Sequence, residues 1–211
     1  MLEVKDITFS FDKKEKKPLI KNLSFSVKNG QIILLKGKSG LGKSTLLNII
    51  SGFCETNLIW TGKILLNNRE INNLRIQKRK IGYVLQEYFL FPHLSVKNNL
   101  LFALKRNRDN EYEFIDDLLE QVGLIEIRNQ FPSEISGGQK ARIACLRALI
   151  AKPDALLLDE PFAGLDYKTK RLFEQFINCQ IKKLKIPCII VSHQNKLKNN
   201  FNELIDLNKY A

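Results

Sequence analysis

The sequence lacks an apolar segment long enough to cross a lipid bilayer. A membrane-spanning helix needs roughly 18 to 20 consecutive apolar residues, and every apolar stretch here is interrupted by charged or polar residues well before that length. The first ten residues, MLEVKDITFS, also lack the basic and apolar regions of a secretory signal peptide. We therefore expect a protein that lies in the cytosol or on the surface of a membrane.

Cysteine is scarce, and its spacing is not that of a metal or redox site. The four cysteines, Cys54, Cys145, Cys179 and Cys188, include no C-x-x-C pair and lie mostly in apolar sequence. Thiols inside cells usually stay reduced. We therefore expect reduced thiols packed in the core, with a disulfide or a metal site as the less favoured alternative.

Acidic residues are few compared with basic ones. The chain has 34 Lys and Arg against 22 Asp and Glu, which gives a formal net charge of +12. Basic residues cluster within segments 13–17, 75–80 and 182–185, and such clusters can bind nucleic acid, anionic lipid or nucleotide. Because these clusters contain no interleaved aromatic residues, we interpret them as a solvated, lysine-rich surface and expect no nucleic-acid partner.

The order of the apolar segments predicts one α/β domain. The 211 residues, 44% of them hydrophobic, suit a single globular domain with a substantial core. Alternating and continuous apolar segments predict strands at 2–11, 23–27, 31–37, 62–68, 80–86, 154–161 and 187–193. Helical spacing predicts helices over 44–52 and 167–184 and through most of 96–150, which forms a helical insertion.

A phosphate-binding loop is predicted directly after one of the buried strands. The segment GKSGLGKST, residues 37–45, matches the pattern G-x-x-x-x-G-K-[ST]. Its glycines let the backbone wrap around phosphate, Lys43 can reach the β and γ oxygens, and the Ser44 hydroxyl can bind Mg²⁺. The flanking strand and helix favour this interpretation over a structural turn. The predicted nucleotide-binding residues are Gly37, Ser39, Gly40, Gly42, Lys43, Ser44 and Thr45.

Polar residues end three other apolar strands. Asp159 and Glu160 close ALLLDE, where Asp159 can hold Mg²⁺ through water and Glu160 can polarise a water that attacks the γ-phosphate. Alone, such a pair is usually a solvated turn, but the phosphate-binding loop favours the catalytic role. Gln86 and His193 end two further strands. If those strands lie beside the strand of the loop, both side chains project towards the γ-phosphate; taken alone, each is more often structural.

A second predicted anion site begins the segment EISGGQKARIACLRAL. Ser136, Gly137 and Gly138 stand directly before residues with helical spacing. Free backbone N–H groups and the positive end of the helix converge there and can hold an anion.

In their order and spacing, GKSGLGKST, Gln86, ISGGQ, LLLDEP, AGLD and SH resemble the ATP-binding subunits of ABC transporters. The resemblance covers essentially the whole chain. It implies a P-loop NTPase fold with a RecA-like core, an antiparallel β subdomain and an inserted helical subdomain at about 88–150, all within one ABC ATP-binding domain of residues 1–211. It also implies an ATPase that uses ATP and Mg²⁺.

The resemblance assigns roles to individual residues. Adenine would stack on Phe11, although core packing is the alternative for Phe11 and for Phe9 on the same strand face. Gln86 would sense Mg²⁺ and the membrane partner, and His193 would be the switch histidine at the γ-phosphate. The implied signature is Ser136, Gly137, Gly138 and Gln139, with Asp166 in the D-loop. The implied catalytic residues are Lys43, Gln86, Glu160 and His193, and the implied Mg²⁺ ligands are Ser44, Gln86 and Asp159.

Two kinds of partner are implied by the same resemblance. Two copies of the chain would pair head to tail, so that each ATP lies between the P-loop of one copy and the signature of the other. Transmembrane permease subunits, and through them possible solute-binding proteins, would complete the complex on the cytoplasmic face of the cytoplasmic (inner) membrane. The segment LQEYFLFPHLSVKNNL is similar to importer subunits, in which exposed Phe89, Phe91, Pro92 and Leu94 would form the permease groove. A packed helical subdomain is the alternative.

The implied activity is ATP hydrolysis that powers solute transport, with an importer favoured. The segments SGGQKARIACLRALIAKPDALLLDEPFAGLD and LIDLNKYA are most similar to Ynj-type subunits of thiamine-like importers. The alternative is an ATPase for lipoprotein release, lipid movement or cell-wall remodelling. A DNA-repair ATPase of this superfamily is disfavoured because it needs a long coiled coil between P-loop and signature. We also expect no regulatory domain after residue 211.

Overall fold

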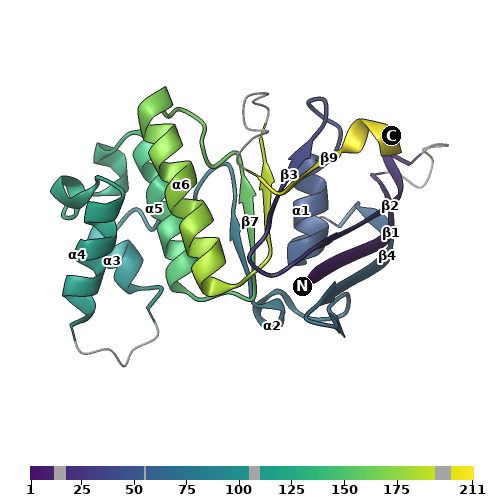
Figure 1. Ribbon diagram of the computed structural model, residues 1–211, viewed down its shortest axis with the longest axis horizontal. Coiled ribbons are helices and arrows are strands. Elements are labelled where there is room, and N and C mark those ends of the chain that lie inside the picture. Colours follow the sequence, from purple (N-terminus) through teal and green to yellow (C-terminus); the bar gives the residue numbers. More distant parts are fainter. Residues whose placement is uncertain (12–17, 55, 105–109, 193–200) are drawn as a thin grey trace.

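Five parallel strands form the central sheet, in the order β6-β7-β8-β3-β9 (Figure 1). The computed structural model describes residues 1–11, 18–54, 56–104, 110–192 and 201–211. Helices cover both faces of the sheet, which explains why β3, β7 and β8 are continuously apolar. The bounds are β3 (Ile32–Lys36), β6 (Ile81–Val84), β7 (Ala155–Asp159), β8 (Cys188–Val191) and β9 (Glu203–Asp206).

A second, antiparallel sheet has the order β2-β1-β4-β5. Its strands are β1 (Leu2–Ser10), β2 (Ile20–Val27), β4 (Ile59–Leu66) and β5 (Arg69–Glu70). The helix α1 (Lys43–Ser51) lies between the two sheets, and one hydrophobic cluster joins its apolar residues to the facing side chains of both (Figure 1). The loop that precedes α1 is therefore anchored from two sides.

A buried arginine stabilises the end of α1. Arg79, the last residue of α2 (Ile76–Arg79), donates hydrogen bonds from Nη1 to the carbonyl oxygens of Ile49 and Ile50, both at 2.9 Å. These carbonyls belong to the last turn of α1, where a positive charge also complements the helix dipole. Arg79 thus fixes the end of α1 that is remote from the phosphate-binding loop.

The other face of the parallel sheet is covered by α5 (Gly137–Ile150) and α6 (Tyr167–Leu184). Beyond them lie α3 (Val96–Leu101) and α4 (Glu111–Gln121), with short 3-10 turns at Ile125–Ile127 and Pro132–Glu134. These elements share a third hydrophobic cluster with α5. They lie within the segment 88–150 that the sequence assigns to a helical subdomain, an assignment that stays a prediction.

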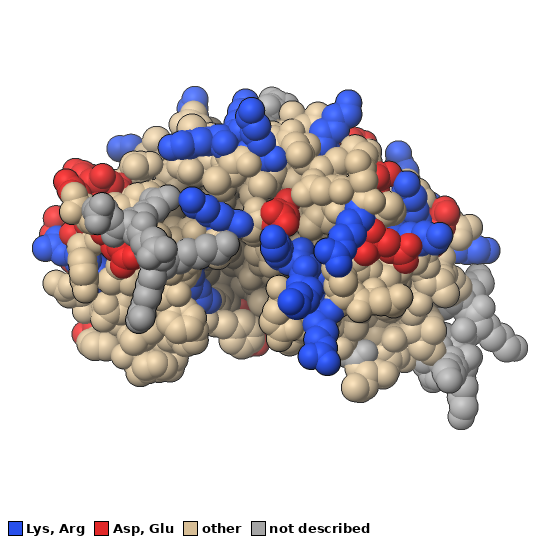
Figure 2. Space-filling model, turned by 90° about the horizontal axis from the view of Figure 1, so that it is seen from below, with Lys and Arg blue, Asp and Glu red and all other residues tan. Residues whose placement is uncertain are grey.

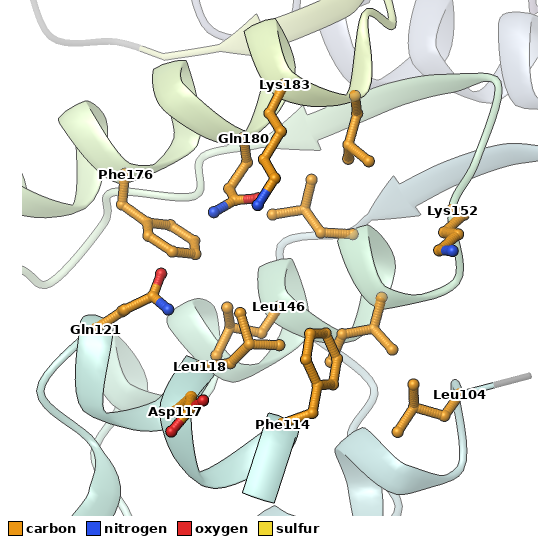
Figure 3. A pocket seen from close by; sticks show the side chains of 13 residues that line it. Leu104, Phe114, Asp117, Leu118, Gln121, Leu146, Lys152, Phe176, Gln180 and Lys183 are labelled. Atoms are coloured by element: carbon orange, nitrogen blue, oxygen red, sulfur yellow. The ribbon is translucent and has the colours of Figure 1, made fainter. Parts of the chain in front are cut away.

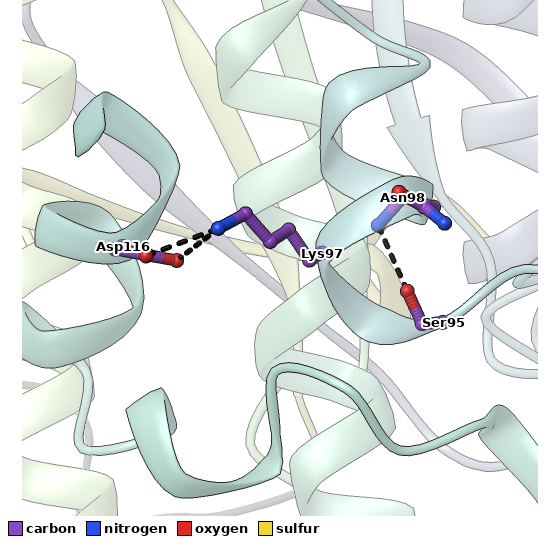
Figure 4. Close-up of polar contacts among 4 residues, drawn as sticks. All are labelled: Ser95, Lys97, Asn98 and Asp116. Carbon is purple, nitrogen blue, oxygen red and sulfur yellow. Dashed lines mark hydrogen bonds and ion pairs between the residues drawn. The ribbon is translucent and has the colours of Figure 1, made fainter. Parts of the chain in front are cut away.

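Polar contacts at α3 support this cluster (Figure 4). Lys97 on α3 lies 3.0 Å from both carboxylate oxygens of Asp116 on α4, and its ammonium lies 4.9 Å from the centre of the Tyr112 ring. The Ser95 hydroxyl accepts a hydrogen bond from the Asn98 N–H at 3.3 Å and caps α3. The two helices are therefore joined by charge as well as by apolar packing.

The expectation that the cysteines lie in the core is wrong for two of them. Cys145 and Cys188 are buried, whereas Cys54 and Cys179 are exposed, and all four are free thiols. Cys54 follows the end of α1, and Cys179 lies on α6 outside the buried stripe that contains Phe173 and Ile177. Neighbouring apolar residues in the sequence therefore did not indicate which side of α6 faces the core.

The surface carries its charges in several groups. Figure 2 shows Lys and Arg side chains at many places on one face, with Asp and Glu between them. Among the residues that the structure describes, no helix combines the length and apolar character needed to span a membrane.

Candidate nucleotide-binding site

The phosphate-binding loop connects β3 to α1 as predicted. Gly42 is the N-cap of α1 and has a φ of 86°, a left-handed conformation that glycine adopts without strain. A Cβ atom at this position would also lie 2.7 Å from Cε2 of Phe9, which belongs to the core beneath the loop. Within the described residues, no side chain caps this helix start. Its first N–H groups and the positive end of its dipole are therefore suited to phosphate.

Lys43 is held by the backbone of the same loop. Its Nζ donates hydrogen bonds to the carbonyl oxygens of Gly37, at 2.9 Å, and Lys38, at 2.8 Å. The residue is only 6% exposed, and burial lowers the pKa of its amine, while the negative charges of Glu160 and Asp159 act in the opposite direction. The ammonium group therefore interacts with the loop and with both carboxylates of the second motif.

The strand register explains how the two motifs meet. Leu35 on β3 and Asp159 on β7 are both paired with Val191 on β8, which lies between them. The carboxyl ends of the three strands therefore reach the same edge of the sheet, where open α/β sheets bind ligands. Asp159 is 5% exposed and ends β7.

Glu160 leaves the strand direction immediately after β7. Its φ of 51° is in the left-handed region, which is uncommon for a residue with a side chain. Its N–H donates to the carbonyl oxygen of Val191 at 3.1 Å, and its own carbonyl accepts from Ala163 at 3.1 Å. These two bonds hold a conformation in which Asp159 and the half-buried Glu160 occupy different environments.

Gln86 is placed differently from the simplest sequence expectation. β8, which leads towards His193, is the neighbour of β3, but β6 lies at the far edge with β7 and β8 in between. Gln86 itself follows β6 in an exposed turn rather than closing the strand. Sequence alone could not supply this strand order. His193 lies outside the described residues, so its predicted role stays a prediction.

The ISGGQ segment forms the start of α5. Ser136 is the N-cap: its hydroxyl accepts from the Gln139 N–H at 3.3 Å, and its N–H donates to Oε1 of Gln139 at 2.7 Å. Ser136 and Gly137 are exposed, while Gly138 is buried. A Cβ atom on Gly138 would lie 2.6 Å from Cδ2 of Leu165, so this glycine permits the close approach of the segment before α6.

The two remaining predicted contacts lie at element ends. Asp166 is the exposed N-cap of α6 and accepts a hydrogen bond from the Thr169 N–H at 3.0 Å. Hydrogen bonds from Thr169 lower the pKa of this carboxyl. Phe11 is half-buried just after β1, whereas Phe9 is fully packed in the core. Core packing therefore explains Phe9, and the adenine-stacking role stays a prediction for Phe11.

One cavity of about 220 Å³ lies elsewhere, between α4, α5 and α6. Figure 3 shows Phe114, Leu146 and Phe176 around it, with Lys183 pointing towards it from α6. Its lining shares no described residue with the P-loop or the ISGGQ segment. It is therefore distinct from the candidate nucleotide site.

Comparisons with known proteins agree with this geometry. The sequence model described as "ABC transporter" matches residues 20–163. The uncharacterised ABC transporter ATP-binding protein YnjD of Escherichia coli K12 is 39% identical over 195 residues, which are 92% of this chain and 88% of YnjD. The iron(III) import ATP-binding protein FbpC of Fusobacterium nucleatum is 39% identical over 181 residues, 84% of this chain, but the match spans only 48% of FbpC.

A solved structure gives the same result at the level of the fold. The dimeric, post-hydrolysis structure of the ATP-binding cassette MJ0796, bound to ADP and Pi, has a TM-score of 0.83 and 27% sequence identity, covering 98% of this chain and 94% of that one. The predicted P-loop fold and ATPase class are therefore confirmed, and the relatives include proteins named as import ATP-binding proteins. The chain belongs to the ABC transporter family of ATP-binding proteins.

Proposed function

We propose that this chain binds Mg-ATP between two copies of itself and hydrolyses it to drive solute import through membrane permease subunits. The observation that carries the proposal is the environment of Lys43. Its ammonium group donates hydrogen bonds to two carbonyl oxygens of the P-loop and interacts with the charges of Glu160 and Asp159. A cationic group at this position can bind the β and γ phosphates between the loop and the carboxylates.

The residues at this edge of the sheet fit a magnesium ion. Ser44 is an exposed hydroxyl in the first turn of α1, and Asp159 is a carboxylate at the end of β7. Both supply the oxygen atoms that Mg²⁺ prefers, and Mg²⁺ would neutralise charge on the phosphate oxygens. We assign Glu160 to orient and polarise the attacking water, and Gln86 and His193 to the γ-phosphate side of the site.

The magnesium assignment predicts a change in cation dependence for Asp159→Asn. Removing the charge should raise the Mg²⁺ concentration for half-maximal hydrolysis by about tenfold or more, while nucleotide binding in excess EDTA stays unchanged. Phosphate release titrated with Mg²⁺ measures the first quantity, and fluorescent ATP binding measures the second. Asp117→Asn on the exposed side of α4 is the matched control. An unchanged Mg²⁺ requirement in Asp159→Asn would remove this residue from the metal site.

A second copy would complete the nucleotide site. The P-loop begins α1 and the ISGGQ segment begins α5, so each chain offers two separate helix starts. The exposed Ser136 and Gly137 can contact a γ-phosphate that the partner copy holds. The structure of MJ0796 matches nearly the whole of this chain and is a dimer, which supports a nucleotide site shared between two copies. Gln139 would act mainly by fixing this helix start, because its side chain forms the capping box.

The permease would bind beside the Gln86 turn. A groove of about 330 Å³ there is lined by Phe89 and Phe102, which are 58% and 68% exposed. Exposed aromatic residues of this size mark an interaction surface. The sequence predicts that Phe89, Phe91, Pro92 and Leu94 are all exposed. This prediction is wrong for Phe91 and Leu94, which are only half-exposed. Phe91 packs edge-on against Phe102, with ring centres 4.6 Å apart.

The permease proposal predicts loss of assembly in Phe89→Asp. A carboxylate at this position would be buried against an apolar partner surface without compensation, so the variant should no longer co-purify with the membrane subunit from detergent-solubilised membranes of its own cells. Its ATP binding should stay unchanged. Phe53→Asp, at an equally exposed phenylalanine after α1, is the control. Co-purification of Phe89→Asp at the wild-type level would contradict the groove, and the proteins recovered with wild type identify any solute-binding protein.

A further inference from the structure

Arg147 connects the helix of the ISGGQ segment to the turn that carries Gln86. It lies in the last turn of α5, and its Nη2 donates hydrogen bonds to the carbonyl oxygens of Phe89, at 2.8 Å, and Tyr88, at 3.3 Å. Its guanidinium also lies 5.2 Å from the centre of the Phe91 ring. A planar guanidinium presents several N–H donors in a fixed geometry and can contact an aromatic face at the same time.

The turn that Arg147 contacts has an unusual backbone. Tyr88 and Phe89 have φ angles of 59° and 37°, in the left-handed region that large side chains rarely adopt. Such conformations are strained and persist only where surrounding contacts hold them. The two carbonyl groups that Arg147 binds belong to these two residues, so the guanidinium acts where the strain is located.

A buried asparagine holds the following residues in the same way. Asn99 is fully buried, its Oδ1 accepts from the Phe91 N–H at 2.9 Å, and its Nδ2 donates to the Phe91 carbonyl at 3.1 Å. Arg147 Nη1 also approaches Oδ1 of Asn99 at 3.4 Å. The segment from Tyr88 to Phe91 is therefore fixed from behind by two polar side chains, while Phe89 remains exposed in the groove.

We propose that Arg147 is a positioning residue that holds the turn after β6 and thereby sets the position of Gln86 for ATP hydrolysis. Because Arg147 lies on the helix that begins at Ser136, a partner that displaces Phe89 would also act on that helix through the guanidinium. The inference rests on the proposed function, specifically on the roles of Gln86 and of the groove. A purely structural role for Arg147 would lower stability without a specific effect on turnover.

A double-mutant cycle on the full-length chain separates these roles. Arg147→Met keeps most of the side-chain length but removes every donor, and Gln86→Ala removes the group that Arg147 is proposed to position. We expect each change to lower kcat by roughly tenfold and to leave KM for ATP within about twofold of wild type. The double variant should be no slower than the slower single variant, because both changes disable one unit. Arg171→Met, on the exposed face of α6, is the control and should behave as wild type.

Each outcome decides the inference. If the two losses multiply to roughly a hundredfold, Arg147 does not act through Gln86 and the inference is wrong, although the proposed function stands. If Gln86→Ala has wild-type kcat, the proposed role of Gln86 fails and the inference fails with it. A folded Arg147→Met protein with wild-type kcat also overturns it. If Arg147→Met does not fold, the cycle is run with Arg147→Lys, which keeps a single donor nitrogen and should give a smaller kcat loss of the same kind.

Discussion

Alanine in place of Lys43 should reduce ATP hydrolysis by at least about a hundredfold. The side chain is the buried cation of the site, bonded to the Gly37 and Lys38 carbonyls and close enough to Glu160 to interact with its charge. Without it, the β and γ phosphates lose their nearest cationic partner. Steady-state phosphate release measures the effect. Lys63→Ala, on the exposed surface of β4, is the matched control and should leave hydrolysis unchanged.

The same residue predicts an alkaline limit to activity. Burial lowers the pKa of the Lys43 amine, so the charged form should be lost at a lower pH than in an exposed lysine. Because kcat/KM reports ionisations of the free protein, kcat/KM for ATP, measured against pH, should therefore fall on the alkaline side before exposed lysines titrate. For the Lys43→Ala substitution, a variant that is folded by thermal melting and turns over ATP at the wild-type rate would contradict the assignment of the P-loop.

Local signals in the sequence predict the elements around the site well. The helix expected over 167–184 has the bounds of α6, and the helix expected from Ser44 begins one residue earlier. The strands β3, β7 and β8 are predicted well, because burial on both faces of the sheet requires a continuous run of apolar residues. The glycine loop between β3 and α1 could be assigned for the same reason, since its pattern and its neighbours agree.

Long-range features were not available from the sequence. The sequence does not predict β9, because Glu203–Asp206 is short and has only one buried residue, yet this strand pairs with β3 in parallel and forms an edge of the sheet. The order that separates β6 from β3 is a property of the whole sheet. The side of α6 that exposes Cys179, and the packing of Phe91 against Phe102, likewise depend on tertiary contacts.

The sequence and the structure give different information about the ISGGQ segment. The sequence indicates a helix start that can hold an anion, and the structure shows how the chain builds it: Ser136 is the N-cap and its N–H donates to Oε1 of Gln139, and Gly138 allows Leu165 to pack against the turn. Arg142 on the next turn donates to the carbonyl oxygens of Gly138, at 3.3 Å, and Val122, at 2.8 Å. The exposed atoms of Ser136 and Gly137 are thus supported from behind, as a surface that meets a partner's nucleotide requires.

Replacement of Glu160 by glutamine should lower hydrolysis by at least about a hundredfold while ATP binding persists. Glutamine keeps the size of the side chain and most of its hydrogen bonding, but it loses the charge that polarises the attacking water. The left-handed backbone at this position is held by main-chain bonds to Val191 and Ala163, so the substitution should leave the local conformation intact. Single-turnover phosphate release and equilibrium ATP binding separate the two effects. Glu113→Gln, at an exposed residue of α4, is the control.

The Glu160→Gln protein should also accumulate as a dimer when ATP is added, because the nucleotide that joins two copies is no longer removed. Addition of ADP should leave it monomeric, since the γ-phosphate that would reach the partner's Ser136 is missing. Sizing with multi-angle light scattering measures the change in mass.

A second substitution, Ser136→Arg, should abolish the ATP-induced dimer by placing a bulky cation against the opposite P-loop. Ser136→Ala removes only the cap of α5, at a cost of about 1 kcal/mol, and should weaken the dimer without preventing it. Retention of the dimer in Glu160→Gln with Ser136→Arg would show that the ISGGQ segment does not share the nucleotide, and a Glu160→Gln protein that stays monomeric in saturating ATP would contradict a stable dimer of the isolated chain.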